Sequence, residues 1–449
     1  MPNQSNPGSA KTRGFSFRLF LLAYQVGWLI ALPLALTRLW WRGKKEPGYR
    51  KHILERLGFY PRAMFTQKPV WIHAVSVGET RASAPLVHAL LERGECILLT
   101  HMTPTGRRTG TEIFKQQIES GKLVQAYLPY DFSWPVKHFY RHFSPKMGAV
   151  METEAWPTLV FVAQKLGLPL YLVNGRLSER SAGRIERFGS LGKELFQSFY
   201  QILAQTQSDA HRYLSLGVQD CQVTGNLKFD VDLPHELVEQ GITWKKQYFQ
   251  NRFVVCAAST REGEEALILQ AWTKIKSPQA LLFIIPRHPQ RFQGVATLIQ
   301  AFGLTFVRRS ALGLDRAFNE DVVLCDSMGE MPLYLAASDF VVMGGSLLEF
   351  GGQNLIEPCS LGKPVILGQY TYNFHQASED AINAGAAWRL SPSSTQEELI
   401  ENLSEFIQSL LNDQSAIDSA SESARKFSEQ FRGATAKTLM YLEKSLLKR

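Results

Sequence analysis

Short apolar runs alternate with helical patterns along most of this chain, and that alternation limits the possible folds more than any other feature. The runs are almost continuously apolar, and the stretches between them have helical periodicity. Strands of this kind are typical of parallel β-α-β units, whose sheets are covered by helices on both faces. The first set of predicted strands comprises 70–75, 96–100, 123–128, 147–151, 169–173 and 202–205.

The pattern then begins again in the second half of the chain. The second set of predicted strands comprises 253–258, 281–285, 304–308, 322–325, 340–343 and 364–367. At 449 residues the chain is too long for one ordinary core, so the sequence predicts an α/β protein with two Rossmann-like, doubly wound domains. Because ligands bind such sheets at the carboxyl ends of the strands, we expect the two domains to face a cleft. The predicted domains are 1–46, 47–228 and 229–449, the last of which includes a terminal amphipathic helix.

The N-terminal region predicts a membrane anchor behind a polar tail, residues 1–14, that we expect to be disordered. From Leu19 to Leu36 the chain is apolar, interrupted only by Gln25, and this length is close to the ~20 residues that cross a bilayer. A cluster of aromatic and basic residues follows, which places the later domains in the cytoplasm: Arg38, Trp40, Trp41, Arg42, Lys44, Lys45, Arg50 and Lys51.

Two other interpretations of this segment compete with a spanning helix. A cleaved signal peptide would need small residues after the apolar run, and residues 37–40 are Thr, Arg, Leu and Trp instead. A helix that lies in the membrane interface is favoured by Arg18, Gln25 and Pro33, which all weaken a span. We expect a spanning helix and keep the interfacial helix as the alternative.

The charge and the cysteines exclude several classes of protein. The formal net charge is +8, which indicates anionic partners such as phosphorylated molecules or acidic lipid. Nucleic acid is disfavoured because the sequence has no zinc-finger spacing, RNP aromatic set or basic helical arm. The five cysteines have no CxxC spacing, so we expect reduced, buried thiols and neither a disulfide framework nor a metal site. No GxxxxGK[ST] loop is present, which excludes a P-loop NTPase.

Several polar segments directly follow predicted strands, where a doubly wound fold places its site. In HAVSVGET (73–80), Glu79 lies at the start of a predicted helix, where its carboxylate could accept a proton from a hydroxyl group. The alternative is that Glu79 only complements the helix dipole. In METEAWP (151–157), Glu152 and Glu154 cannot both be comfortably buried, and the sequence leaves open which of them faces the cleft.

Other segments suit a nucleotide with phosphate groups. Lys228 in TGNLKFD (224–230) could offset the charge of a phosphate leaving group or be a solvated lysine. Arg287, after Pro286, is either a phosphate ligand or a surface arginine. The segment 326–330 has the character of a strand-to-helix turn.

The glycine pairs at 344–345 and 351–352 would let backbone amides approach a phosphate, with a helix beginning near Asn354 to add its dipole. Glu357, about one turn into that helix, could accept hydrogen bonds from ribose hydroxyls. Asp230-Val231-Asp232 looks like a metal-binding DxD motif but lies in the predicted linker, so we interpret it as a solvated turn.

Taken together, these segments resemble those of the Kdo (3-deoxy-D-manno-octulosonic acid) transferases of lipopolysaccharide synthesis. The resemblance covers essentially the whole chain. It rests on many matching segments in the same order, which together are far more specific than any one of them. They are HAVSVGET, MTPTG (102–106), YLPYD (127–131), METEAWP, NGRLS (174–178), TGNLKFD, STREGEE (259–265), PRHPQRF (286–292), DSMGE (326–330) and GGQNLIEP (351–358).

The resemblance implies a GT-B glycosyltransferase that is inverting and independent of metal and cofactor. It implies CMP-Kdo as donor, a lipid A precursor (lipid IVA) as acceptor, and the cytoplasmic face of the bacterial inner membrane, with its anionic lipid, as location. The first domain would bind the acceptor and the second the nucleotide sugar.

Residue by residue, Glu79 matches the catalytic base, and Glu152 and Lys228 match residues that stabilise the transition state. The implied CMP contacts are Pro286, Arg287, Met328, Gly329, Glu330, Asn354, Leu355, Ile356 and Glu357. Many members have His where this chain has Gln353, and glutamine cannot transfer a proton.

Two rival functions remain at this stage. A sugar-nucleotide epimerase also uses two Rossmann-like halves, but it would need no membrane anchor. A membrane-bound nucleotide-binding protein without catalytic activity would bind CMP and release none from CMP-Kdo. The sequence leaves open the number of Kdo residues transferred and the oligomeric state.

Overall fold

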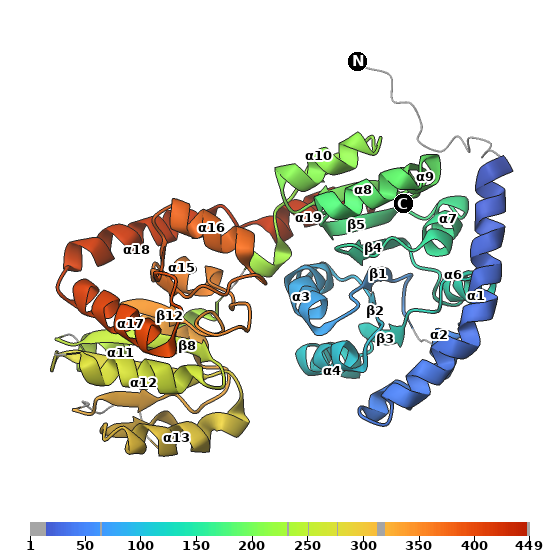
Figure 1. The fold of residues 1–449 in the computed structure, drawn as a ribbon. Helices are drawn as coiled ribbons and strands as arrows, with labels where there is room; N and C mark the ends of the chain where they lie inside the picture. The colour runs from blue at the N-terminus through green and yellow to red at the C-terminus, as the bar shows by residue number, and fades with distance from the viewer. Residues whose placement is uncertain are drawn as a thin grey trace. The chain divides into compact units, whose positions relative to one another are not determined.

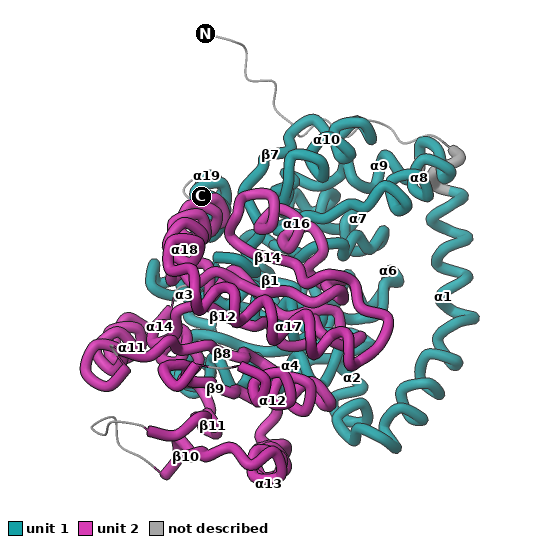
Figure 2. The backbone as a smooth tube through the Cα atoms, turned by 60° about the vertical axis from the view of Figure 1, so that its left-hand side comes forward, with its two compact units in different colours: residues 1–230, 433–449 teal, residues 231–432 magenta. Residues whose placement is uncertain are grey.

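The computed structural model describes residues 15–62, 65–230, 233–249, 251–275, 277–311 and 319–446, without the side chains of 15–18 and 191. The chain forms two compact units, which Figure 2 distinguishes by colour. Unit 1 comprises residues 1–230 and 433–449, and unit 2 comprises residues 231–432. The predictions for the polar tail and for Val231 and Asp232 of the DxD look-alike lie outside the described residues.

The described part of unit 1 is built on a parallel sheet with the strand order β3-β2-β1-β4-β5-β6-β7. Its strands are β1 (Val70–His73), β2 (Ile97–His101), β3 (Leu123–Tyr127), β4 (Met147–Met151), β5 (Leu170–Gly175), β6 (Gln201–Ala204) and β7 (Cys221–Val223). Its helices are α1 (Phe15–Arg42), α2 (Ile53–Arg56), α3 (Val77–Glu92), α4 (Pro104–Ile113), α5 (Lys115–Glu119), α6 (Ser133–Phe143), α7 (Pro157–Lys165), α8 (Glu179–Arg187), α9 (Ser190–Gln197), α10 (Gln207–Ser215) and α19 (Ala434–Leu446). The short 3₁₀ turns η1 (Pro47–Arg50) and η2 (Leu227–Phe229) complete the unit.

The strands of unit 1 are largely apolar because both faces of the sheet are covered. Alternate residues of a strand point to opposite faces. In β1, Trp71 packs into the cluster that contains Phe139 of α6, whereas Val70 and Ile72 pack into the cluster that contains Leu86 of α3. All four residues of β1 are therefore buried.

The terminal helix α19 packs on unit 1, which differs from the predicted domain 229–449. Leu439 and Leu442 of α19 are buried in the same cluster as α3. Asp230 holds the start of α19 by accepting hydrogen bonds from the backbone N–H groups of Gly433 (2.9 Å) and Thr435 (2.5 Å). An amphipathic pattern predicts a buried face, but it does not say which sheet covers that face.

The described part of unit 2 repeats the architecture with the strand order β10-β11-β9-β8-β12-β13-β14, again with parallel pairs. Its strands are β8 (Phe253–Thr260), β9 (Ala280–Pro286), β10 (Phe306–Arg308), β11 (Val322–Leu324), β12 (Phe340–Met343), β13 (Val365–Leu367) and β14 (Ala387–Arg389). Its helices are α11 (His235–Tyr248), α12 (Glu264–Lys274), α13 (Phe292–Ala301), α14 (Met331–Ala337), α15 (Ile356–Ser360), α16 (His375–Asn383), α17 (Gln396–Leu411) and α18 (Gln414–Glu429), with 3₁₀ turns η3 (Pro289–Arg291) and η4 (Arg309–Ala311). The prediction of two Rossmann-like, doubly wound units is confirmed.

The apolar N-terminal segment forms the long helix α1, drawn in blue in Figure 1. Within the described residues, α1 is the one helix that is long and apolar enough to cross a membrane by length and composition. It packs on unit 1, where Leu39 is buried with Tyr49 and Tyr130. The helix therefore agrees with the predicted membrane anchor.

The five cysteines are free thiols, and all but the half-buried Cys221 are buried. Burial raises the pKa of Cys221 and Cys359 to about 12 and also raises the pKa of Cys256, which leaves these thiols protonated and inert at neutral pH. The prediction of reduced, structural thiols agrees with this arrangement.

Candidate active site

The strand order of unit 1 defines one place where a ligand can enter the edge of the sheet. After β1 the chain turns to one side, to β2 and then β3, and it later returns to β4 on the other side of β1. The loops that follow β1 and β4 therefore diverge at the carboxyl edge, which is where doubly wound sheets bind ligands. Glu79 follows β1 and Glu152 follows β4, so two of the three predicted catalytic residues lie at this switch point.

Glu79 occupies the first turn of α3, after the N-cap residue Ser76. One carboxylate oxygen accepts a hydrogen bond from the backbone N–H of Val75 (2.8 Å), and the other accepts one from the hydroxyl of Ser76 (3.3 Å). Glu79 thus stabilises the start of its own helix, in agreement with the alternative role at the helix N-terminus that the sequence left open. That support does not exclude a role in catalysis.

The surroundings of Glu79 raise its pKa to about 7, mainly because the carboxyl group is partly buried. The hydrogen bond from Val75 lowers the pKa, and the nearby charges of Glu152 and Glu154 raise it again. A carboxylate with a pKa near the working pH is suited to accept a proton during a reaction.

Glu152 and Lys228 form an ion pair, with 2.7 Å between the Glu152 Oε1 and Lys228 Nζ atoms. Glu152 has a left-handed backbone conformation (φ 57°) directly after β4, and its backbone N–H bonds the carbonyl of Val173 in β5. Lys228 lies in η2, where the side chains of Asn174 and Asn226 accept the N–H groups of Leu227 and Lys228. The structure thus brings together two predicted residues that are far apart in the sequence.

Glu154 has a different partner from Glu152. Its carboxylate accepts a hydrogen bond from the indole N–H of Trp156 (2.6 Å), and burial raises its pKa. The sequence could not distinguish the two glutamates of METEAWP. In the structure Glu152 forms the ion pair with Lys228. Glu154 is an additional negative charge that raises the pKa of Glu79.

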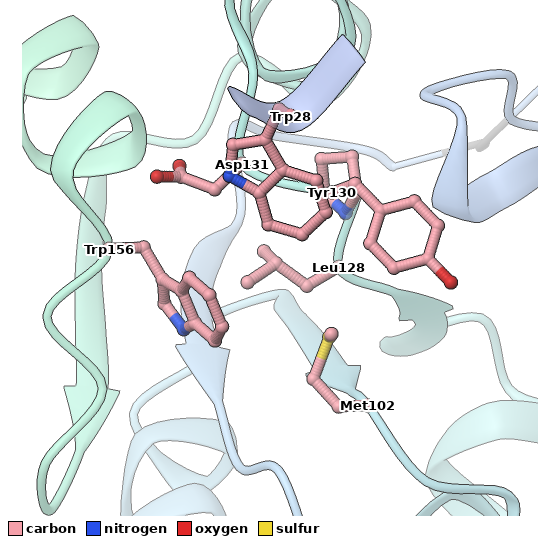
Figure 3. A pocket seen from close by; sticks show the side chains of 7 residues that line it. Trp28, Met102, Leu128, Tyr130, Asp131 and Trp156 are labelled. Carbon is pink, nitrogen blue, oxygen red and sulfur yellow. The ribbon is translucent and has the colours of Figure 1, made fainter. Parts of the chain in front are cut away.

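A narrow pocket in unit 1 connects α1 with the segment that carries Glu154. It is lined by Trp28, Met102, Leu128, Pro129, Tyr130, Asp131 and Trp156, and Figure 3 shows most of these side chains gathered around Leu128. Among the described residues, no group of three or more His, Cys, Asp or Glu side chains could hold a metal ion.

The switch point of unit 2 lies between β8 and β12, and a glycine allows the two strand ends to approach. The N–H of Gly344 bonds the carbonyl of Ala258 (2.8 Å). A Cβ atom at position 344 would lie 2.4 Å from the backbone oxygen of Ser259, so only glycine is accommodated without a shift of the backbone.

The loop after β12 is stabilised by the carboxylate of Glu264, a fully buried residue that was not predicted from the sequence. Its carboxylate accepts the backbone N–H groups of Gly345 (2.7 Å), Leu347 (3.0 Å), Leu348 (3.3 Å) and Arg261 (2.8 Å). The amide of Gly345 is therefore bonded to a carboxylate, and the expectation that it approaches a phosphate is wrong. A Gly-Glu-Glu run at a helix start was the available signal.

Arg287 directly follows β9, whose last residue, Pro286, is buried. The Arg287 backbone N–H bonds the carbonyl of Thr260, and the residue is exposed. Beside it, the Arg261 guanidinium lies 3.2 Å from the His288 Nε2 atom. The pKa of His288 is lowered by partial burial and by the charges of Arg261, Arg287 and Arg291. Arg291 is paired with Glu265 (2.9 Å) and Glu262 (3.5 Å). Arg261 and Arg287 lie beside His288 at the carboxyl edge of β8 and β9, and this basic group suits an anionic ligand.

The DSMGE turn follows β11 and exposes two of its three predicted contact residues. Met328 is 68% exposed, and Gly329 has a positive φ of 84°. The Glu330 carboxylate accepts hydrogen bonds from Arg309 (2.9 Å), Tyr334 (2.9 Å) and Ser327. Glu330 is fixed by these partners and therefore stabilises the turn.

The GGQNLIEP segment differs from its prediction in one respect. The helix α15 has five residues and begins at Ile356, so Glu357 lies in its first turn and not one turn further. The Asn354 side chain bonds both the Glu357 carboxylate (3.2 Å) and the N–H of Ile356 (3.1 Å). The side chains of Leu355 and Ile356 are buried, so these two residues can contact a ligand only through the backbone.

Each unit thus has a doubly wound sheet with polar loops at its switch point, an arrangement that defines the GT-B class of glycosyltransferase folds. Solved structures with the same fold include a glycosyltransferase from Rickettsia africae, with a TM-score of 0.53, 12% identity, and coverage of 85% of this chain and 99% of that chain. A UDP-GlcNAc 2-epimerase from Neisseria meningitidis bound to UDP-GlcNAc has a TM-score of 0.51 and 15% identity, with 85% and 100% of the two chains covered. At these identities the likeness shows the fold alone, because transferases and epimerases share it.

Sequence comparisons identify the particular family. The model of the 3-deoxy-D-manno-octulosonic-acid transferase (kdotransferase) family matches residues 51–231. The chain is 43% identical to the 3-deoxy-D-manno-octulosonic acid transferase of Bordetella pertussis over 380 residues, which are 84% of this chain and 87% of the relative. It is 36% identical to that of Haemophilus influenzae over 353 residues, 77% of this chain and 81% of the relative. The chain belongs to the Kdo transferase family of lipopolysaccharide biosynthesis, and the predicted resemblance is confirmed.

Proposed function

We propose that this chain transfers Kdo from CMP-Kdo to a lipid A precursor, lipid IVA, at the cytoplasmic face of the bacterial inner membrane. We further propose that the transfer inverts the configuration of the sugar and requires no metal ion. Family membership supports the reaction. The basic edge at β8 and β9 of unit 2 supports an anionic nucleotide donor.

The proposed reaction is a direct displacement at the ketosidic carbon of Kdo. Glu79 takes the proton of an acceptor sugar hydroxyl while the oxygen of that hydroxyl forms a bond to the ketosidic carbon. The bond from that carbon to the phosphate oxygen breaks, and CMP leaves with the bonding electrons. The observation that carries this proposal is the position of the half-buried Glu79 carboxylate in the first turn of α3, at the switch point of its sheet. Its raised pKa, about 7, supports the role of a base.

The leaving CMP is already acidic, so it needs stabilisation of its charge more than protonation. We propose that Arg287 offsets the phosphate charge as a bidentate ligand. Lys228, held by Glu152 at 2.7 Å, supplies a second positive charge whose position is fixed before the reaction. Preorganised charges of this kind contribute to catalysis because they need no rearrangement when the charge develops.

The proposed residues of the nucleotide site are those of the three loops after β9, β11 and β12. Met328 and Gly329 are proposed to contribute exposed surface, and the buried Pro286, at the end of β9, and Leu355 only their backbone. Asn354 and Glu357, which are bonded to each other, are proposed to meet the polar groups of the donor. Gln353 is half-buried and serves as a hydrogen-bonding group without a proton-transfer role.

The test is the Glu79→Gln variant, assayed with CMP-Kdo and lipid IVA by mass analysis of the lipid product. We expect loss of transfer with unchanged binding of CMP. The matched control is Glu92→Gln, since Glu92 is exposed in the last turn of the same helix and should keep full activity. Transfer by Glu79→Gln at the wild-type rate would remove Glu79 as the base.

Because a UDP-GlcNAc 2-epimerase from N. meningitidis shares this fold, the same assay must also distinguish a transferase from an epimerase. An epimerase would convert its sugar nucleotide without a lipid acceptor. A binding protein would release no CMP at all. Release of CMP that depends on the lipid acceptor distinguishes a transferase from both.

A further inference from the structure

The face of α1 that packs on unit 1 contains polar contacts in the middle of an otherwise apolar helix. The Tyr24 hydroxyl donates a hydrogen bond to the Asp131 carboxylate (2.9 Å). The Gln25 side chain donates to the Thr158 hydroxyl (2.8 Å) and accepts the backbone N–H of Ser133 (2.6 Å). In the sequence, Gln25 was a polar residue that weakened the prediction of a membrane-spanning helix. In the structure its side chain is hydrogen-bonded to Thr158 and Ser133 of unit 1.

Asp131, whose carboxylate accepts the hydrogen bond from Tyr24, also stabilises the backbone of unit 1. Asp131 is 3% exposed and also accepts the backbone N–H groups of Thr158 (2.9 Å) and Leu159 (2.8 Å), in the first turn of α7. Separation of α1 from unit 1 would remove a partner from this buried group. We therefore treat α1 as a fixed part of unit 1.

Apolar and aromatic contacts continue along the same face of α1. The Trp28 ring lies 5.4 Å from that of Tyr130, and Leu39 is buried. The contacts thus run from Tyr24 to Leu39, roughly 24 Å at ~1.5 Å per residue. Residues 15–23 of α1 precede them and span only about 13 Å, much less than the ~30 Å of a bilayer core. The helix cannot cross a membrane while it stays docked.

The opposite face of α1 is apolar and exposed. Leu22, Val26, Leu29, Ile30 and Leu34 are between 47% and 71% exposed. A contiguous apolar surface of this kind indicates an apolar partner.

The C-terminal end of α1 indicates which partner that is. Trp40 and Trp41 are 59% and 66% exposed, and basic residues surround them: Arg38, Arg42, Lys44, Lys45 and Lys51. Tryptophan prefers the boundary between lipid and water, and lysine and arginine bind anionic headgroups. This combination of exposed tryptophans and basic residues fits an anionic lipid surface.

We propose that α1 lies in the plane of the membrane, with its exposed face inserted in one leaflet and its other face fixed to unit 1. The protein is then monotopic, and its N-terminus stays on the same side of the membrane as both units. This inference does not depend on the sugar or nucleotide that the enzyme uses. It selects the interfacial arrangement over the spanning one.

The first experiment measures on which side of the membrane the chain begins. The full-length protein carries one epitope at its N-terminus and another at its C-terminus. We expect protease to remove neither epitope from intact spheroplasts and both epitopes from inverted membrane vesicles. Removal of the N-terminal epitope alone from spheroplasts would show a spanning helix and overturn the inference.

The second experiment measures binding to the lipid surface. Purified full-length protein is floated with vesicles of phosphatidylethanolamine and phosphatidylglycerol. Ile30→Glu places a charge in the exposed face of α1. It should weaken binding at least about tenfold, since it removes one apolar side chain that would insert into the lipid. The control Leu214→Glu alters an apolar residue of α10 that is 47% exposed and should bind as the wild type does. Equal binding of Ile30→Glu and the wild type would refute contact between this face and lipid.

Folding and chemistry are monitored in the same preparations. The circular dichroism spectrum and Tm of Ile30→Glu should match those of the wild type. Its rate on acceptor dispersed in detergent should also be unchanged, so a failure of the membrane inference is distinguishable from a failure of the proposed reaction. A large loss of Tm in Ile30→Glu would mean that this face packs on protein and would also overturn the proposal.

Discussion

Replacing Glu154 by glutamine tests the electrostatic origin of the raised pKa of Glu79. The substitution removes one of the two neighbouring negative charges that raise the Glu79 pKa. The amide oxygen of glutamine can still accept the hydrogen bond from the Trp156 indole, which Glu154 accepts at 2.6 Å. The loop should therefore keep its structure while the pKa of Glu79 falls.

The size of the effect follows from the energy of one neighbouring charge. Charge pairs in partly exposed surroundings interact by about 0.2–1 kcal/mol, which corresponds to at most about 0.7 pKa unit. With a pKa of about 7, roughly a tenth of Glu79 is ionised at pH 6. A decrease of about half a unit raises that fraction to roughly a quarter. The expected gain is about 2.5-fold at pH 6 and negligible above pH 8.

The assay is the pH dependence of kcat/KM, which reports the ionisation of groups in the free enzyme. For the wild type we expect the rate to rise with pH and to level off above pH 7, because the ionised form of Glu79 is the active one. For Glu154→Gln we expect the same profile displaced to lower pH. An unchanged or upward-displaced acid limb would refute the coupling between these two carboxylates.

Three other substitutions test separate parts of the site. Glu79→Gln should raise Tm at pH 8 relative to the wild type but not at pH 4, because burial raises the Glu79 pKa and the folded state loses stability as pH rises from the unfolded value of 4.5 through about 7. Lys228→Met should lower kcat by about 10²–10³-fold through loss of a preorganised charge, and calorimetry should show weaker binding of CMP because the phosphate loses a positive neighbour. Glu264→Gln should destabilise unit 2 by about 1–3 kcal/mol in thermal unfolding and raise KM for the donor, because an amide cannot accept all the N–H groups that the carboxylate accepts. The control for that last variant is Glu262→Gln, whose side chain is 84% exposed and should be silent.

The central strands of both units were predictable because parallel strands covered on both faces are long and apolar. The edge strands β7 and β14 were missed. Their sequences, Cys-Gln-Val and Ala-Trp-Arg, are short, contain a polar residue and are largely half-buried, so neither forms a continuous apolar run. The side of the sheet that α19 covers could not be predicted either, since it depends on contacts far apart in the sequence.

The residues of the candidate site also fall into two groups, those that the sequence pattern could locate and those that only tertiary contacts reveal. Residues that directly follow strands, such as Glu79 and Arg287, could be located from the pattern alone. The pairing of Glu152 with Lys228 and the support of the Gly345 loop by Glu264 arise from tertiary contacts. Gln25 shows the same limitation, because its sequence context suggested an unfavourable polar group in a membrane and its partners lie more than a hundred residues away.

The hydrogen bonds of Asp230 to Gly433 and Thr435 place the outgoing and returning chain side by side within unit 1. Unit 2 is therefore an insertion into unit 1, and the last helix completes the domain with which the chain begins. A C-terminal truncation would expose the buried surface beneath α19 and damage the unit that contains Glu79, although the deleted residues follow unit 2 in sequence. An independently folded unit 2 is best produced by excision at both of its connections, and unit 1 by joining residue 230 to residue 433 through a short linker.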